Sequence, residues 1–234
     1  MPEKKIPYHT KPNELTVEEW QAGLRKQYAR EQNFKFENTG DHPVYSDFKV
    51  YNPKTEKTYR VSLRDGVESY NFCSCPDFTI NSLGTCKHIE YLLHYFSTYK
   101  KYHRYLAHPV NPDQSSLSIL YGSERRIRLE RSTKVDAFLQ EEEFFDAFGL
   151  LKPGMLDHIE MFIDSARKLD SGFIVYPDVE EYIRHYHKRK QNRLLADRLF
   201  PQGKNSEIFD NLIHARLYNY QKEGVIGIVQ QSRI

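Results

Sequence analysis

The pattern of apolar and polar positions changes its period several times along the chain. Near the N-terminus, Trp20, Leu24 and Tyr28 recur at the spacing of one helix face. Thr16 is followed three residues later by Glu19, and this pair can form a capping box that satisfies free backbone N–H groups at a helix start. We therefore expect a helix to follow Thr16. Residues 1–14 show no period and are expected to form a flexible tail.

The next segments alternate with the period of two that is typical of strands. Residues 44–52 and 58–64 flank the turn-forming run NPKTEK and predict a β-hairpin, while residues 69–75 could add a third strand. From residue 89 the helical period returns, with apolar side chains at 89, 92, 93 and 96. Residues 15–104 thus predict a domain with a small antiparallel sheet and a helix packed on it.

The second half of the chain is predicted to be mostly helical, with one hairpin. Residues 116–131 predict this second hairpin around Gly122. Helical patterns follow in residues 134–151, 154–169 and 177–200, and Lys-Pro-Gly and Asp-Ser-Gly runs separate them. The whole pattern predicts the α+β class, with a helical extension in residues 105–204 and a further segment in residues 205–234.

Composition and charge exclude several classes of protein. The chain has 234 residues with 39% hydrophobic residues, and no apolar run approaches the roughly 20 residues that cross a bilayer. The N-terminus lacks the apolar core of a signal peptide, so we expect a cytoplasmic protein. The net charge is only +2, so any contact with nucleic acid must come from local clusters of basic residues.

All three cysteines lie in one short segment, as Cys73, Cys75 and Cys86, and His88 follows the last of them by two residues. Zinc takes four nitrogen or sulfur ligands in a tetrahedron. Cys73 and Cys75 can share one face at the end of a strand. Cys86 and His88 would point about 200° apart in a regular helix. We therefore expect Cys86 in a turn, which Gly84 allows, and His88 in the first helical turn. One structural Zn²⁺ would join strand to helix.

Three other interpretations of this segment remain open. The thiols could be buried structural residues beside an incidental histidine, or Cys73 and Cys75 could form a redox pair. A catalytic zinc would need a free coordination position and a nearby acid or base, for which Asp77 and Glu90 are close in sequence. Four soft ligands close the coordination shell and favour the structural role.

Two clusters of basic residues are candidates for contacts with nucleic acid. The first falls in residues 100–134, where tyrosines that could stack on unpaired bases interleave with the cations, and the second falls in residues 184–193. The alternative for both is a solvated helix face. The residues that we expect to contact phosphates are Lys100, Lys101, Arg104, Arg125, Arg126, Arg128, Lys188 and Arg189.

The cysteine segment resembles a SWIM zinc finger. The runs TYRVSLR, NFCSCPDF and LGTCKHIE are similar to the SWIM modules at the N-terminus of bacterial Swi/Snf-type helicase-like ATPases. The run LYNYQKEGV, residues 217–225, resembles the segment that opens the first motor lobe in that superfamily, which implies that Gln221 contacts the adenine of ATP. The Gly-x-x-x-x-Gly-Lys-Ser/Thr loop that binds phosphates does not occur in the chain.

The resemblance implies a zinc-binding accessory region of a DNA-dependent ATPase, which binds DNA or positions the motor on it. Residues 205–234 would begin the motor lobe, and a longer parent protein, not this chain, would bind and hydrolyse ATP. No nucleophile–base pair elsewhere in the chain predicts an enzyme. The alternative function is a protein–protein interaction adaptor, in which zinc is purely structural and no nucleic acid binds.

Overall fold

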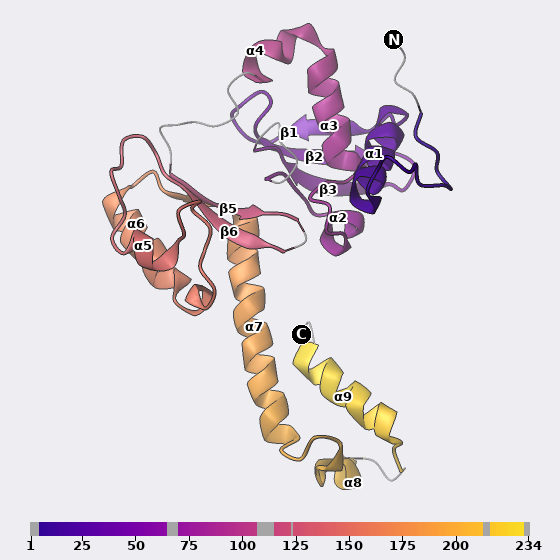
Figure 1. Ribbon diagram of the computed structural model, residues 1–234, viewed down its shortest axis with the longest axis vertical. Coiled ribbons are helices and arrows are strands. Elements are labelled where there is room, and N and C mark those ends of the chain that lie inside the picture. The colour runs from indigo at the N-terminus through magenta and orange to yellow at the C-terminus, as the bar shows by residue number, and fades with distance from the viewer. Residues whose placement is uncertain (1–4, 65–69, 107–114, 123, 213–215, 232–234) are drawn as a thin grey trace. The chain divides into compact units, whose positions relative to one another are not determined.

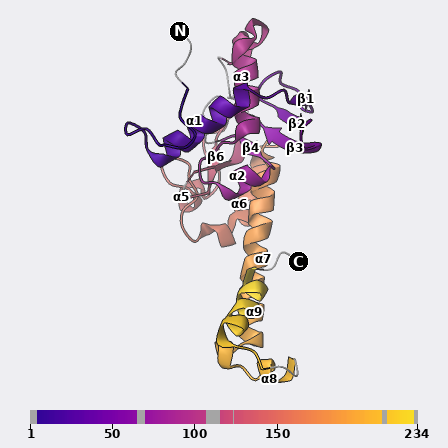
Figure 2. The same ribbon diagram turned by 90° about the vertical axis from the view of Figure 1, so that its right-hand side faces the viewer.

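The computed structural model describes residues 5–64, 70–106, 115–122, 124–212 and 216–231 (Figures 1 and 2). Contacts divide the chain into two compact units, Met1–Tyr176 and Pro177–Ile234. Helices combine with a four-stranded antiparallel sheet and a three-stranded mixed sheet, so the predicted α+β class is confirmed. Among the described residues, every helix is too short or too polar to cross a bilayer.

The predicted N-terminal helix is present as α1 (Val17–Arg30), and its capping box is formed in full. The Thr16 hydroxyl accepts a hydrogen bond from the Glu19 N–H at 3.1 Å, and the Thr16 N–H donates to the Glu19 carboxylate at 2.8 Å. The segment before it runs against the helix. The Ile6 N–H donates to the Gln27 side chain at 2.7 Å, and the Trp20 indole donates to the Pro7 carbonyl at 2.8 Å.

The first sheet has the order β1-β2-β3-β4, with β1 (Lys35–Asn38), β2 (Asp47–Asn52), β3 (Lys57–Ser62) and β4 (Phe72–Cys73). The predicted hairpin is β2 with β3, and the expected third strand is β4, in which Cys73 pairs with Val61. The sequence pattern did not predict β1. Buried and exposed positions do not alternate in this strand, because three of its four residues are exposed.

Helix α3 (Lys87–Thr98) packs its apolar face on this sheet, and α1 lies beside it (Figures 1 and 2). The rings of Phe96 on α3 and Phe48 on β2 lie 5.4 Å apart, and both side chains are buried. The short helix α2 (Pro76–Ile80) precedes α3, while η1 (Lys100–Tyr102) and α4 (His103–Leu106) follow it. The helix predicted from the apolar positions 89, 92, 93 and 96 is thus confirmed.

The second sheet contains the predicted hairpin, β5 (Ser116–Leu120) with β6 (Arg126–Glu130), and a short parallel strand, β7 (Ile174–Val175). Ile127 and Leu129 of β6 are buried, so its alternate residues face outward. Helix α6 (Ile159–Leu169) and the 3₁₀ turn η2 (Met155–Asp157) fall in the segment predicted to be helical. A cluster of aromatic rings fills this core, made of Phe138, Phe144, Phe145, Phe162 and Phe173.

The prediction of a helix over residues 134–151 is wrong. Only α5 (Glu141–Phe144) is helical, and residues 149–151 run along the outer edge of β6. There the Leu151 N–H donates to the Ile127 carbonyl at 2.8 Å and the Leu129 N–H donates to the Gly149 carbonyl at 2.8 Å. Gly149 has φ of +72°, which a helix interior does not permit. The open edge of β6 therefore supplies backbone partners that the helical pattern of this segment could not reveal.

The second unit begins with α7 (Pro177–Leu199), as predicted, and continues through η3 (Gly203–Asn205), α8 (Ile208–Leu212) and α9 (Asn219–Gln231). Its core is small. Phe200 and Phe209 stack with centroids 5.0 Å apart, and both are buried with Ala196. Apolar side chains of α9, including Val225 and Val229, pack against this cluster. Helices α8 and α9 are therefore held to the end of α7.

Candidate metal centre

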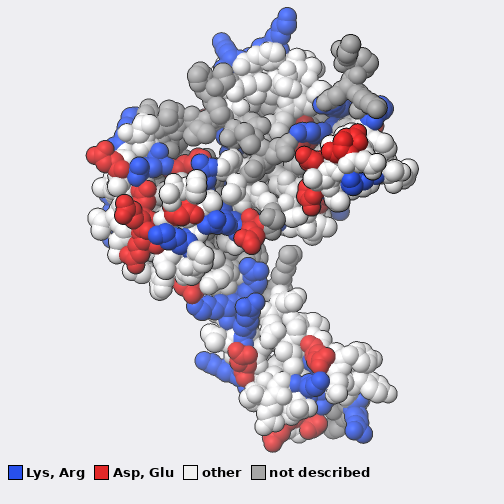
Figure 3. Space-filling model, in the orientation of Figure 1, with Lys and Arg blue, Asp and Glu red and all other residues white. Residues whose placement is uncertain are grey.

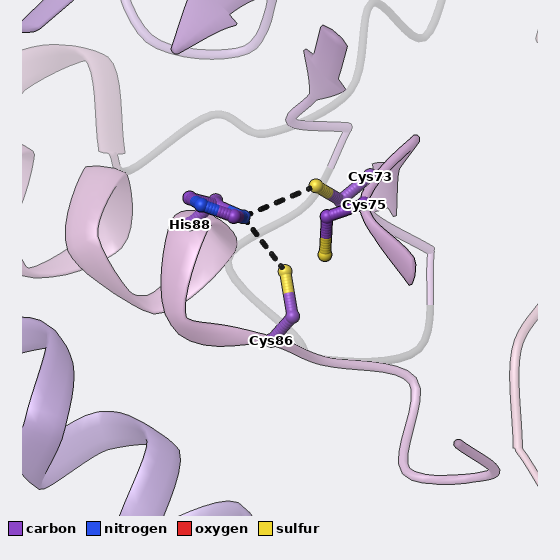
Figure 4. A group of neighbouring side chains, drawn as sticks. All are labelled: Cys73, Cys75, Cys86 and His88. Carbon is purple, nitrogen blue, oxygen red and sulfur yellow. Dashed lines mark hydrogen bonds between the residues drawn. The ribbon is translucent and has the colours of Figure 1, made fainter. Parts of the chain in front are cut away.

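The three cysteines and His88 lie together where β4 ends and α3 begins (Figure 4). Cys73 ends β4, Cys75 caps the N-terminus of α2, Cys86 is the N-cap of α3, and His88 lies in the first turn of α3. Their exposed fractions are 0%, 2%, 0% and 1%. The predicted placement of Cys86 before the helix and His88 inside it is confirmed.

The loop between α2 and α3 brings Cys86 back toward β4. Asn81 closes this loop, because its side chain accepts a hydrogen bond from the Leu83 N–H at 2.9 Å and donates to the Thr85 carbonyl at 3.1 Å. Gly84 has φ of +71°, a conformation that few other residues adopt. Cys86 is then fully extended, with φ of −155° and ψ of 170°, and points its thiol inward as α3 begins.

The distances within this group suit a tetrahedral metal ion. The four ligand atoms all lie within 4.8 Å of one another. His88 Nδ1 lies 3.7 Å from the sulfur of Cys73 and 4.0 Å from the sulfur of Cys86 (Figure 4). Tetrahedral bonds of about 2.0–2.3 Å place neighbouring ligand atoms roughly 3.5–3.8 Å apart. The group could therefore hold a metal ion, with Nδ1 as the nitrogen ligand.

Protonation of the thiols points to the same chemistry. Burial raises the pKa of Cys73 well above its usual value and raises the pKa of Cys86 as well. The pKa of Cys75 is lowered, because its sulfur accepts hydrogen bonds from Cys73 and Cys86. Burial thus disfavours three negative charges at this site. A metal cation would replace the thiol protons and compensate three buried thiolates.

Aromatic rings enclose the His88 imidazole and keep water out. The ring of Phe34 lies 5.0 Å away and that of Tyr59 lies 4.7 Å away, measured between centroids. His88 Nε2 is buried and has no hydrogen-bond partner within the described part of the chain. The imidazole is therefore positioned by packing of these rings and by the contacts of Nδ1 with the sulfur atoms of Cys73 and Cys86.

The two nearby carboxylates do not complete a catalytic site. Asp77 accepts two hydrogen bonds from the Arg25 guanidinium, at 2.6 and 3.0 Å. Glu90 is 3% exposed and accepts a hydrogen bond from the Thr85 hydroxyl at 2.6 Å. Both carboxylates thus have structural partners. The cysteines form no disulfide, and they converge with His88 rather than pairing. This arrangement favours a structural metal over a redox pair or a catalytic ion.

The basic residues predicted to bind phosphates fall in three places. Lys100, Lys101 and Arg104 are exposed on η1 and α4, beyond the C-terminal end of α3. Arg125, Arg126 and Arg128 lie on or beside β6. Since Arg125 donates to the Thr79 carbonyl of α2 at 2.7 Å, this second group lies near the opposite end of α3 from the first. Lys188 and Arg189 lie on α7, in the second unit.

The arginines of β6 are engaged within the molecule. Arg126 pairs with Asp146 at 3.2 Å and Arg128 approaches Glu130 at 3.9 Å. The Arg128 guanidinium also lies 4.9 Å from the ring of Tyr70. In contrast, Lys188 and Arg189 have no hydrogen bond or ion pair with the described residues. Figure 3 shows Lys and Arg side chains gathered along the middle of α7. Lys188 and Arg189 are therefore more available to a ligand than the arginines of β6.

Gln221, which the resemblance assigns to adenine, caps α9. Its side-chain oxygen accepts a hydrogen bond from the Tyr218 N–H at 2.9 Å. In a capping box, the residue three positions after the N-cap makes this hydrogen bond. The Lys222 N–H donates to the Tyr218 carbonyl at 3.1 Å, which makes Tyr218 the N-cap. Gln221 is otherwise exposed.

Sequence reasoning missed the residues that surround the metal ligands. Phe34 precedes β1 and Tyr59 lies on β3, far from the cysteine segment in sequence. Neither belongs to a motif, and only the alternation around Tyr59 places that side chain on one face of a strand. Their proximity to His88 follows from the strand pairing and could not be inferred from local spacing.

Comparison with family models, with curated proteins and with solved structures found no match to this chain. Its function must therefore be inferred from the residues of the metal site and from the surfaces around it.

Proposed function

We propose that this chain is a zinc-binding accessory region of a Swi/Snf-type DNA-dependent ATPase, in which a SWIM zinc finger supports contact with DNA. The convergence of Cys73, Cys75, Cys86 and His88 at tetrahedral distances is the observation that carries this proposal. Three thiolates and one imidazole in a closed, buried shell are typical ligands of structural zinc. The sequence resemblance supplies the rest of the proposal.

Zinc in this site would act on folding rather than on a reaction. Its ligands come from the end of β4 and the start of α3, so the ion would join sheet to helix in the way that a disulfide joins two segments. Such thiolates must stay reduced, which is consistent with a cytoplasmic protein. The fourth ligand closes the shell, so no position is left for a substrate.

DNA contact would depend on cations that are available at the surface. On α7 these are Lys188 and Arg189, which have no partner among the described residues and lie in a segment, residues 182–196, with five Lys and Arg residues and no Asp or Glu. Lys100, Lys101 and Arg104 form a second exposed group. Neither group offers a helix with side chains arranged to read base edges, so binding should be independent of sequence.

A titration with labelled duplex DNA at several salt concentrations tests this function. We expect weak binding, with dissociation constants of about 10⁻⁴–10⁻⁶ M near physiological salt, and a linear fall of log affinity with log salt. The cause is release of counterions from phosphates that Lys and Arg neutralise. Two duplexes of unrelated sequence should bind about equally. Absence of binding even at low salt would overturn the DNA-binding function.

In this account, ATP belongs to a longer parent protein, and the chain itself is not an enzyme. Phosphoryl transfer needs a loop of backbone N–H groups with a Lys on the phosphates and a Mg²⁺ site. The sequence contains no Gly-x-x-x-x-Gly-Lys-Ser/Thr. Gln221 could contact adenine through its side-chain amide, but that contact alone holds no phosphate.

A protein-binding adaptor is the second candidate function, and one surface favours it. On and beside α9, Tyr218, Tyr220 and Ile228 are 71%, 69% and 68% exposed. The two tyrosine rings stack with centroids 5.9 Å apart. Exposed aromatic residues are enriched where proteins bind one another. If the DNA titration fails, the adaptor becomes the favoured function, with zinc purely structural.

A further inference from the structure

Three tyrosines lie along one stripe of α3 at a spacing of four residues, and the last of them is exposed. Tyr91 and Tyr95 have ring centroids 6.5 Å apart, and Tyr95 and Tyr99 have centroids 4.5 Å apart. Tyr99, the C-cap of α3, is 49% exposed. Tyr102 of η1 contacts Tyr95 at 6.0 Å and the buried Phe96 at 4.8 Å. We call Tyr95, Tyr99 and Tyr102 the α3 platform.

A chain of aromatic contacts joins this platform to the metal site. The ring of Phe34 lies 5.0 Å from His88 and 5.1 Å from Tyr91. The Tyr91 hydroxyl also donates to the Phe34 carbonyl at 2.7 Å. The side chain of Tyr99 is thus supported from one side by rings that are themselves anchored in the core. An exposed ring held in this way loses little conformational entropy when a ligand covers it.

The charge around the platform is positive. Residues 91–112 contain no Asp or Glu. Lys100, Lys101 and Arg104 follow Tyr99 directly, and all three are exposed. The Lys101 ammonium lies 4.7 Å from the centre of the Tyr102 ring, and the Arg104 guanidinium lies 4.6 Å from the centre of the Tyr105 ring. Cations and aromatic rings therefore alternate over a short exposed surface.

We propose that the α3 platform binds single-stranded nucleic acid, with an unpaired base stacked on Tyr99 and adjacent phosphates at Lys100 and Lys101. Rings provide a surface for bases and cations for the backbone, which is the combination that single-strand binders use. In a duplex the bases are already stacked on one another, so Tyr99 should contribute little to the binding of a duplex. This inference rests on the proposed nucleic-acid function and assigns the single strand to a surface separate from α7.

Binding of the full-length chain to an oligo-dT of about 15 nucleotides and to a duplex of equal length, measured by fluorescence anisotropy, tests the platform. Tyr99→Ala should weaken single-strand binding by about fivefold or more, since stacking contributes that much per base, and should change duplex binding less than twofold. Tyr99→Phe should retain the affinity. Tyr8→Ala is the matched control, because Tyr8 is also 49% exposed.

The outcomes separate this inference from the proposed function. If the unmodified chain binds duplex and single strand but Tyr99→Ala binds both unchanged, the platform is refuted and DNA binding stands. If Tyr99→Ala weakens both equally, the stacking role is also refuted, because a duplex has no free base to stack. If the unmodified chain binds neither, the proposed function falls, and the platform falls with it.

Discussion

Replacing Cys86 with serine will release the metal and unfold the region around the first sheet. Structural zinc sites in small domains contribute on the order of 10 kcal/mol to folding, and whole domains are stable by only about 5–15 kcal/mol. Cys86 has no exposed surface, and it is the N-cap from which α3 begins. A serine hydroxyl there is a poor ligand and leaves two thiolates close to an uncoordinated imidazole. Circular dichroism and metal content should both report the loss.

The second unit provides an internal reference in this experiment. Its core of Ala196, Phe200 and Phe209 contains no metal ligand, so part of the helical signal should survive in Cys86→Ser. Ser82→Ala is the matched control, because Ser82 is exposed in the same loop and is not a ligand. We expect Ser82→Ala to keep its metal and its melting temperature. A Cys86→Ser protein that melts like the unmodified chain would contradict a structural metal.

Reversing two charges on α7, as Lys188→Glu with Arg189→Glu, should produce the largest loss of affinity for nucleic acid. Both cations are free of partners in the described part of the chain, and no acid occurs between residues 182 and 196. Two lost phosphate contacts should lower the slope of log affinity against log salt by about 2. Two added carboxylates also repel the backbone, so affinity at low salt should fall roughly 10- to 100-fold for every sequence.

A second double reversal distinguishes a site on α7 from the effect of total charge. Lys35→Glu with Lys49→Glu changes the net charge by the same amount, on exposed positions of β1 and β2. We expect this variant to bind almost as well as the unmodified chain, with an unchanged salt slope. Equal losses in the two double variants, or no loss in the α7 variant, would refute α7 as the phosphate-binding segment.

Local signals in the sequence predicted the parts of the fold that local chemistry determines. The capping box at Thr16, the two hairpins and the start of α3 are each set by residues close together in the chain. The four residues that could hold a metal ion were identified for the same reason, since their spacing in the sequence is compact. Strands β1 and β7 were missed because they are short and are stabilised by pairing with distant strands.

The arginines of β6 show where sequence reasoning fails for surfaces. A run such as Arg125, Arg126 and Arg128 looks available to phosphates until its partners are known. Asp146, which pairs with Arg126, lies 20 residues away in the segment that was expected to be helical. Because residues 149–151 instead follow the edge of β6 and the Asp146 N–H donates to the Leu150 carbonyl, that segment brings an acid to the arginines. That Lys188 and Arg189 have no partner among the described residues could be established only from the three-dimensional structure.

The metal content of the purified chain tests the central claim most directly. Elemental analysis by mass spectrometry, on protein prepared without added metal, should give one zinc per chain, held by Cys73, Cys75, Cys86 and His88. The ligand atoms of these four side chains lie within 4.8 Å of one another. A preparation that is folded and contains no stoichiometric metal would contradict the account.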